Sequence, residues 1–252
     1  MIKFSDISTS GWDFAITGMR NSYASWEKSD SIWDGKDFKG EDIFVIGPND
    51  MKLASRLAKR GGPHAKFRRM IHVQMNILAP LYFWKEWDTY KIGTNANSTS
   101  TMHSIMKNEF LRDAFSCDHL APDSMRMLDE IIDLLNKWRQ IYLIADVNDI
   151  AIKKEYWWQI IQLLPSSYNQ LRTVDLNYEV LAQMCEYRAE HKLDEWRDFC
   201  KMIHDRVPYA KQLIFCEKEA EDDKRCGSCE TGSEEVESQR TDDVSDACVS
   251  NE

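Results

Sequence analysis

The hydrophobic pattern of the chain predicts one alternating strand and several helices. Apolar and polar residues alternate over residues 70–78, as expected of a strand with one buried face. Over residues 124–145, apolar side chains recur every three or four positions, which predicts a long amphipathic helix. Further helices are expected over residues 14–25, 49–60, 148–164 and 175–203, and a short strand or turn over residues 43–46. This mixture predicts an α/β (α+β) fold.

Polar residues, glycine and proline mark the expected ends of these elements. Asn49 or Asp50 is expected to cap the helix over residues 49–60, and the glycine pair at 61–62 to end it. Pro80 stands at a plausible first helical position, ahead of the segment LYFWKEWDTYK. Asp175 is expected to cap the helix over residues 175–203. The polar segment over residues 93–104 is predicted to be a loop.

Charge divides the chain into two parts. Residues 217–252 carry 13 acidic and 4 basic side chains, a net charge of −9. The first 216 residues carry the other 29 acidic and 28 basic side chains, a net charge of −1. Such a body lacks the basic field that non-specific nucleic-acid binding requires. We predict a folded domain over residues 1–216 and a disordered acidic tail over residues 217–252, because the tail has few apolar residues to bury.

The sequence predicts a cytoplasmic protein with reduced thiols. The N-terminal segment MIKFSDISTSGWDF lacks the apolar stretch of a signal peptide, and no run approaches the ~20 apolar residues of a membrane span. The seven cysteines are scattered and odd in number, which does not favour a disulfide framework. Cys226 and Cys229 form a lone CxxC without a second ligand pair, so we interpret it as incidental. Cys117, Cys185 and Cys200 are expected to be ordinary buried thiols.

The predicted helix over residues 175–203 carries polar residues at both ends of one face. Asn177, Leu181, Met184, Arg188 and His191 fall near one line at about 100° per residue. Asn177 and Arg188 would be about 16 Å apart along the axis, which suits an elongated ligand such as a dinucleotide. The alternative is an amphipathic helix whose ends are polar by chance.

Two further segments are candidates for phosphate binding. Residues 93–104 are rich in hydroxyls and amides, although such segments are often exposed connectors. His64 follows two glycines and a proline and precedes the basic cluster Lys66, Arg68 and Arg69. Glycine permits close approach of a ligand and the cations could meet phosphates, whereas the alternative is a helix-ending turn with solvated charges. The sequence contains no HExxH, Walker, GxGxxG or nucleophile-elbow motif.

Two early segments resemble the flavin-dependent thymidylate synthases (ThyX). MRNSYAS is similar to the family's Arg-x-Ser segment, which places Ser22 on a flavin-contacting serine. GGPHAKFRRMIHVQMNILAPLYFWKEW is similar to the family's Gly-His segment followed by a strand, Ala-Pro and Gln-Trp. The match places His64 on a flavin-binding histidine and Glu86 on a glutamine that contacts the nucleotide.

A third segment extends the resemblance over roughly residues 14–205. LLPSSYNQLRTVDLNYEVLAQMCEYRAEHKLDEW is similar to the family's Leu-Pro followed by an Asn-x-Arg-x-Leu helix that ends in Leu-Arg. The resemblance places Asn177 on an asparagine that contacts flavin. It places Arg188 on the arginine that holds the uracil of dUMP.

The family signature RHRxxSxNExSxRY is altered in this chain. Lys91 keeps one positive charge, Thr99 or its neighbour Ser100 replaces a serine, and Glu179 replaces the arginine two residues after Asn177. Arginine and lysine are not equivalent where a planar fork grips phosphate. In the same register the chain has Thr89-Tyr90-Lys91, Thr94, Ala96-Asn97, Thr99 and Thr101-Met102, and candidate replacements for the lost arginines are Arg172, Arg68 and Lys66.

The resemblance implies a small strand layer flanked by long helices, assembled as a homotetramer with active sites between subunits. In the family, FAD takes hydride from NADPH, and a methylene group from methylenetetrahydrofolate is added to dUMP and reduced to give dTMP. Arg188 would be the catalytic residue, stabilising charge that develops on the pyrimidine. Cofactor-binding residues would be Ser22, His64, Lys66, Arg69, Lys91, Asn177 and Gln183, and substrate-binding residues Glu86, Thr99, Ser100 and Arg188.

The chain is thus expected to be a flavin-dependent methyltransferase acting on a dUMP-like pyrimidine nucleotide. No metal, nucleic-acid or membrane partner is expected. The alternative is a catalytically inactive homologue that serves as a nucleotide-binding or assembly module.

Removing residues 217–252 is expected to leave the oligomeric state and Tm nearly unchanged, because this segment offers almost no apolar surface for packing. Size-exclusion chromatography and calorimetry of the full-length and truncated chains measure both quantities. A large fall in Tm on truncation would show that the segment is part of the folded structure.

Overall fold

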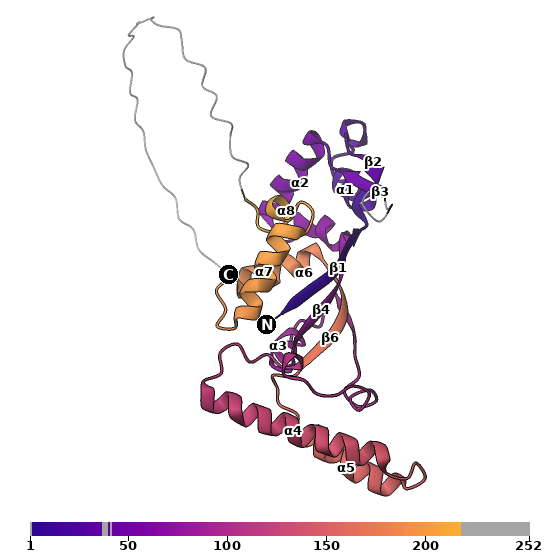
Figure 1. Ribbon diagram of the computed structural model, residues 1–252. Helices are drawn as coiled ribbons and strands as arrows, with labels where there is room; N and C mark the ends of the chain where they lie inside the picture. The colour runs from indigo at the N-terminus through magenta and orange to yellow at the C-terminus, as the bar shows by residue number, and fades with distance from the viewer. Residues whose placement is uncertain (1, 37–39, 41, 218–252) are drawn as a thin grey trace, which may run out of the picture. The chain divides into compact units, whose positions relative to one another are not determined.

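A four-stranded antiparallel sheet forms the centre of the fold, with the strand order β1-β4-β6-β5 (Figure 1). The computed structural model describes residues 2–36, 40 and 42–217. The strands are β1 (Lys3–Ser10), β4 (His72–Pro80), β5 (Thr94–Ser98) and β6 (Asn169–Asn177), and a separate antiparallel pair is formed by β2 (Ile32–Lys36) and β3 (Asp42–Val45). Together with the helices, these strands confirm the predicted mixed fold class.

The two central strands, β4 and β6, pair over nine consecutive positions and present different chemistry on their two faces. Met75 lies opposite Val174, and both side chains are buried. Gln74 lies opposite Asp175 on the other face, and its amide donates to the Asp175 carboxylate at 3.2 Å. Because successive side chains of a strand point to opposite faces, one face joins the core and the other stays polar.

Helices share the main hydrophobic core with the apolar face of this sheet. Aromatic rings fill its centre: Trp196 stacks on Trp87 with ring centroids 6.0 Å apart and contacts Phe83 at 4.7 Å. The aromatic segment that follows Pro80 is therefore core. The contributing helices are α1 (Trp12–Asn21), α2 (Pro48–Arg60), the 3₁₀-helix η2 (Ala65–Met70), α3 (Leu81–Trp87), α6 (Tyr178–Arg188), α7 (Asp194–Arg206) and α8 (Ala210–Leu213).

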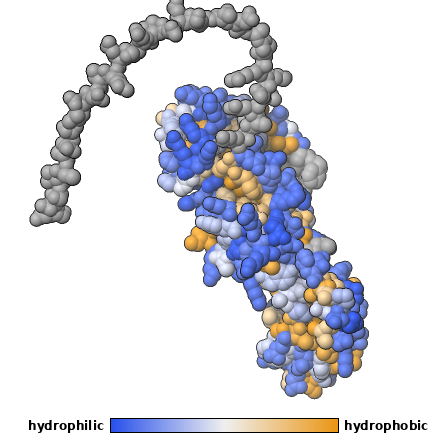
Figure 2. Space-filling model, turned by 90° about the vertical axis from the view of Figure 1, so that its left-hand side faces the viewer, coloured by the Kyte–Doolittle hydropathy of each residue, from blue (hydrophilic) through white to orange (hydrophobic). Residues whose placement is uncertain are grey.

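A second, smaller core lies between α4 (Pro122–Ile144) and α5 (Ile150–Leu163). Leu135 and Ile160 are fully buried there, together with Phe115, which follows the 3₁₀-helix η3 (Arg112–Ala114). Figure 2 shows apolar side chains gathered on the surface of this helix pair, at the lower end of the view. The exposed apolar residues include Met127, Leu134, Leu143, Ile144, Val147, Ile150 and Trp158.

Most of the predicted elements are confirmed, with boundaries shifted by a few residues. The strand expected over residues 70–78 is β4, and the short element over residues 43–46 is β3. The helices expected over residues 14–25, 49–60, 124–145 and 148–164 are α1, α2, α4 and α5. Pro80 is the last residue of β4 and the N-cap of α3, so it precedes the helix instead of occupying its first position.

The single helix predicted over residues 175–203 is wrong. Asp175 lies in β6, which is paired on both sides, and this sheet pairing overrides the local helical pattern. Asn177 caps α6 instead, because its Oδ1 accepts a hydrogen bond from the backbone N–H of Val180 at 3.0 Å. A turn then separates α6 from α7, and His191 lies in that turn. Leu181, Met184 and Arg188 remain on the predicted line within α6, with Leu181 and Met184 in the core.

The polar segment over residues 93–104 is not entirely a loop. Its first half forms β5, an edge strand that pairs with β6 from Leu176 to Arg172. The side chains of β5 are mostly exposed, so the segment lacks the apolar alternation from which a half-buried strand is predicted.

The capping of α2 also differs from the prediction. Gly47 is the N-cap, and neither Asn49 nor Asp50 caps the helix with its side chain. The carboxylate of Asp30 accepts hydrogen bonds from the backbone N–H groups of Asn49 at 2.9 Å and Asp50 at 3.1 Å. A residue distant in sequence therefore satisfies the first free donors of the helix.

Asp50 is fully buried within α2 and pairs with Arg20 of α1. Arg20 Nε lies 2.5 Å from Asp50 Oδ1, and Asp50 Oδ2 accepts from the hydroxyls of Ser29 at 2.7 Å and Ser31 at 2.6 Å. Burial alone would raise the pKa of Asp50, but the hydrogen bonds from Ser31, Ser29 and Arg20 outweigh it and lower the pKa. The network joins α1, α2 and the segment between them.

The described residues set limits on other predictions. No described helix combines the length and apolar character needed to cross a membrane. Within the same residues, no three His, Cys, Asp or Glu side chains converge as metal ligands. Cys185 and Cys200 are buried as expected, and Cys117 is half-buried. Residues 218–252, with Cys226 and Cys229, lie outside the described residues, so the acidic tail stays a prediction.

Replacing Asp50 with Ala is expected to lower the free energy of unfolding by about 3–5 kcal/mol, because Arg20 would remain buried without its counter-charge. The lowered pKa of Asp50 means that the pair stabilises the fold above pH ~4 and that this stability is lost as the pH falls. Urea unfolding at pH 7 and at pH 3.5 measures both effects. Asp133→Ala, an exposed change in α4, is the control and should stay within about 0.5 kcal/mol; equal unfolding midpoints for both variants would refute the assignment.

Candidate functional site

Four of the predicted cofactor-binding residues line one cavity of about 800 Å³ at the C-terminal end of α1 and along η2. Ser22 follows the last turn of α1, and His64, Lys66 and Arg69 come from η2 and the turn before it. The glycine pair at 61–62 adopts positive φ values of 64° and 52°, which ends α2 and turns the chain into η2. The local glycine geometry therefore brings these residues beside α1.

The cavity combines apolar walls with positive charge. Leu57 and Phe67 contribute buried apolar surface. Lys66 and Arg69 are exposed, and neither forms an ion pair with a carboxylate of the described chain. A flat ring system that carries phosphate groups needs this combination, because the ring is desolvated against apolar walls and the phosphates meet cations. The residues present therefore fit a flavin nucleotide.

Arg188 lies at the end of α6 in a cage of one carboxylate and two aromatic rings. Its Nη1 is 2.9 Å from Glu86 Oε2, and its Nε donates to the Tyr90 hydroxyl at 3.0 Å. The guanidinium carbon lies 5.0 Å from the ring centroid of Trp196. The Arg188 side chain is 17% exposed, so it is neither sealed in the core nor surrounded by water.

The cage keeps Arg188 protonated, and the Glu86 carboxylate offsets part of its positive charge. Burial alone would lower the pKa of Arg188, but the hydrogen bond with Tyr90 and the charge of Glu86 outweigh it and raise the pKa. The guanidinium is therefore a permanent cation. Its Nη2 has no hydrogen-bond partner among the described residues and remains available to a ligand oxygen.

Asn177, the N-cap of α6, packs against Gly93, the residue immediately before β5. Asn177 is 9% exposed, and its Oδ1 is used to cap the helix. Gly93 has a φ of 76°, and a Cβ on it would lie 3.0 Å from the Asn177 side-chain amide nitrogen. Glycine thus allows the chain before β5 to pack closely on Asn177.

Two of the three candidate replacements for the lost arginines are already paired within the chain. Arg68 Nη2 lies 2.6 Å from Glu179 Oε2 in a buried ion pair, and Arg68 Nη1 donates to the Leu213 carbonyl at 3.1 Å. Arg172 Nη1 lies 2.6 Å from Asp88 Oδ1. Of the three candidates, Lys66 alone has no acidic partner among the described residues.

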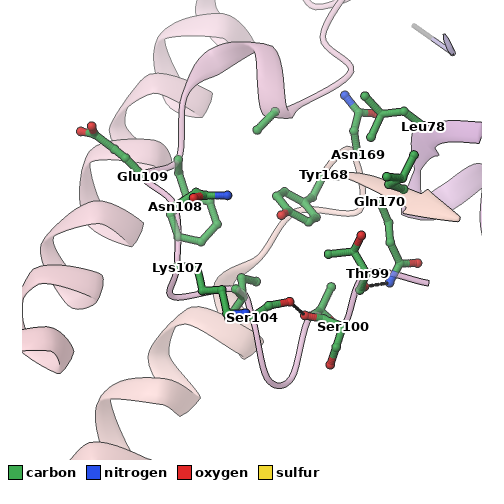
Figure 3. A pocket seen from close by; sticks show the side chains of 15 residues that line it. Leu78, Thr99, Ser100, Ser104, Lys107, Asn108, Glu109, Tyr168, Asn169 and Gln170 are labelled. Atoms are coloured by element: carbon green, nitrogen blue, oxygen red, sulfur yellow. Dashed lines mark hydrogen bonds between the residues drawn. The ribbon is translucent and has the colours of Figure 1, made fainter. Parts of the chain in front are cut away.

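Thr99 and Ser100 border a different cavity, of about 520 Å³, at the start of β6 (Figure 3). Gln170 Nε2 donates to the Thr99 carbonyl at 2.8 Å, and the Ser100 hydroxyl Oγ accepts from the His103 backbone N–H at 3.0 Å. Lys107, Asn108 and Glu109 lie on the opposite side of the cavity in Figure 3. Lys107 is the only cation in the lining, so this cavity offers less positive charge than the one beside η2.

The predicted site residues thus fall into separate groups within one chain. Ser22, His64, Lys66 and Arg69 share the first cavity, Thr99 and Ser100 share the second, and Glu86 contacts Arg188. Asn177 caps α6, while Lys91 and Gln183 are exposed on the surface.

The sequence did not predict that two residues, Tyr90 and Trp196, contact Arg188. Tyr90 stands within the altered family signature, but its sequence distance of 98 residues from Arg188 hides the hydrogen bond between them. Trp196 appears in sequence only as one of many aromatic residues, and α7 carries it against the guanidinium. The signal that could have marked Tyr90 is its place between Thr89 and Lys91, where the family has a histidine.

Comparisons with known proteins find similar structures but no similar sequences. No family model matches the sequence, and a search of curated proteins finds no match. Among solved structures, the chain is similar to thymidylate synthase X (ThyX) from Helicobacter pylori with FAD and dUMP, with a TM-score of 0.60 and 16% identity over 87% of this chain and 100% of that chain. A second structure of flavin-dependent thymidylate synthase ThyX from Helicobacter pylori, complexed with FAD and dUMP, matches with a TM-score of 0.57 and 16% identity over 85% and 100%. The described chain therefore has the fold of these flavin-dependent thymidylate synthases.

Proposed function

We propose that this protein is a divergent flavin-dependent thymidylate synthase, which uses FAD, NADPH and methylenetetrahydrofolate to convert dUMP to dTMP or to methylate a related pyrimidine nucleotide. The observation that carries the proposal is the cavity of about 800 Å³ that collects Ser22, His64, Lys66 and Arg69. These residues come together in a chain whose fold matches enzymes solved with FAD and dUMP. The altered signature at residues 89–102 makes it a divergent member.

Each group of residues has a role in this proposal. FAD, when bound, would supply the hydride chemistry. Lys66 and Arg69 would hold its phosphates, and Ser22 and His64 would orient its ring system. Arg188 would donate hydrogen bonds from Nη2 to an oxygen of the pyrimidine and stabilise negative charge that develops there. Tyr90 would position the guanidinium through its hydrogen bond to Nε.

A second chain would complete the site. Within one chain, Thr99 and Ser100 line a different cavity from the cofactor-binding residues, so an active centre that uses both needs a second copy. The exposed apolar residues of α4 and α5, among them Leu143, Ile144 and Val147, support a homotetramer by offering surface for burial.

One observation favours the alternative of an inactive nucleotide-binding or assembly module. Glu86 neutralises part of the charge of Arg188, and Arg68 and Arg172 are held by Glu179 and Asp88. A site with its arginines engaged internally has less positive charge for two phosphorylated ligands than the resemblance implies.

The purified protein is expected to bind FAD and to be yellow, because the cavity beside η2 offers apolar walls and unpaired cations. Lys66→Gln with Arg69→Gln should weaken FAD binding at least tenfold, since both phosphate-facing charges are removed. Visible absorbance and a flavin fluorescence titration measure the binding. Lys137→Gln with Lys154→Gln, two exposed lysines on α4 and α5, is the matched control; a colourless wild-type protein that takes up no FAD would exclude the flavin enzyme.

Replacing Arg188 with Ala is expected to weaken dUMP binding by about 30-fold or more while leaving the fold intact, because a partly buried cation that faces the base is lost. Isothermal titration with dUMP measures the affinity, and circular dichroism checks the fold. Arg197→Ala, a surface arginine paired with Asp194, is the control and should leave dUMP affinity unchanged. Wild-type affinity in the Arg188 variant would reject its role.

Rescue of a thymidine auxotroph tests the activity itself. Growth without thymidine, lost in the Arg188→Ala variant and kept in Arg197→Ala, is the expected result. A protein that binds FAD and dUMP but never rescues growth would support the inactive module.

A further inference from the structure

A second basic cavity, of about 710 Å³, lies between the end of α1, the 3₁₀-helix η1 (Trp26–Lys28) and α2, and the roles above do not use it. Four of its lining residues come from α2 with spacings of three and four, so they share one face of the helix. The lining consists of Arg20, Tyr23, Ser25, Lys28, Asn49, Lys52, Leu53 and Arg56. Every charged residue in this set is a cation.

The positive charge of this cavity is largely uncompensated. Lys28, Lys52 and Arg56 form no ion pair with a carboxylate of the described chain. Lys52 and Arg56 lie one turn apart on α2, so their like charges destabilise the helix unless an anion screens them. The cluster stands out because the first 216 residues have a net charge of only −1.

The wall of the cavity is held rigidly by a buried arginine. Arg20 is 4% exposed; its Nε is paired with Asp50, and its Nη1 donates to the Ser25 carbonyl at 3.2 Å. Its Nη2 has no hydrogen-bond partner among the described residues. A donor of a charged, nine-tenths buried side chain in the cavity lining is therefore open to a ligand.

Nearby carboxylates do not cancel this charge. Asp50 is engaged by Arg20 and the serines of the preceding segment. Asp30 accepts from the first backbone N–H groups of α2, so the helix N-terminus already has its anion. Glu27 belongs to η1 but does not line the cavity.

We propose that this cavity binds a small molecule that carries a diphosphate or triphosphate group. Lys28, Lys52 and Arg56 match the several negative charges of such a group, whereas a single phosphate would leave part of this positive charge unmatched. The Tyr23 ring, with the Arg56 guanidinium carbon 5.8 Å from its centroid, offers a flat surface to an attached planar group. The cavity volume is in the range of small-molecule sites.

The site is distinct from the cavity assigned to flavin. The two cavities share Tyr23 and no other lining residue. The basic residues of one come from η1 and α2, and those of the other from η2. The proposal therefore stands without the proposed enzyme activity.

Isothermal titration of the full-length protein with sodium tripolyphosphate and with ATP, at 0.15 M NaCl, tests the proposal. Lys52→Gln with Arg56→Gln should weaken tripolyphosphate binding at least tenfold. Lys59→Gln with Arg60→Gln removes the same charge from the last turn of α2, outside the cavity, and should change it less than twofold. Tighter binding of ATP, abolished by Tyr23→Ala, would assign a nucleoside triphosphate; equal binding would assign the phosphate chain alone.

Three results would overturn the proposal. The first is that neither tripolyphosphate nor ATP binds the wild-type protein. The second is that both double variants lose affinity for tripolyphosphate equally, which would show a general charge effect. The third is that the double variant Lys52→Gln with Arg56→Gln weakens FAD binding, measured by absorbance, as much as it weakens tripolyphosphate binding. That result would make these cations part of the flavin cavity.

Discussion

The pairing of β4 with β6 is the constraint on which the candidate site depends. Its nine pairs place His72 opposite Asn177, and the backbone N–H of Tyr178 then donates to the Ile71 carbonyl at 3.0 Å as α6 begins. A slip of one residue would turn Val174 from the core to the polar face. Because β4 continues into α3 and β6 into α6, the same register decides where Glu86 and Arg188 meet.

Elements that carry their own periodicity could be predicted, and elements defined by their neighbours could not. The alternation of β4 and the apolar stripe of α4 are visible in sequence, because each buries one face. β6 was hidden because Asp175 and the residues after it also fit a helix, and only pairing with β4 and β5 decides between them. β5 is an exposed edge strand without an apolar face, so its sequence resembles a loop.

Residue types at the candidate site were predictable from the family resemblance, whereas their partners were not. Sequence shows that Arg68 and Glu179 are charged, but they are 111 positions apart, and only the fold makes them a buried pair. A buried pair is weak evidence for stability, since desolvation offsets the attraction, yet it removes both groups from ligand binding. An unpaired cation in a cavity, such as Lys66, is therefore better evidence of a ligand than an arginine retained from a motif.

The position of Glu86 determines what Arg188 can do. Where the family that the sequence resembles has a neutral glutamine, this chain places a carboxylate 2.9 Å from the guanidinium. The carboxylate holds the guanidinium in place, but it also opposes negative charge on a nearby base, which an amide would not do. Glu86→Gln is therefore expected to strengthen dUMP binding if Arg188 serves an active site, as titration can measure. In an inactive module, where the pair serves only structure, the same change should lower the unfolding free energy and leave nucleotide affinity unaltered.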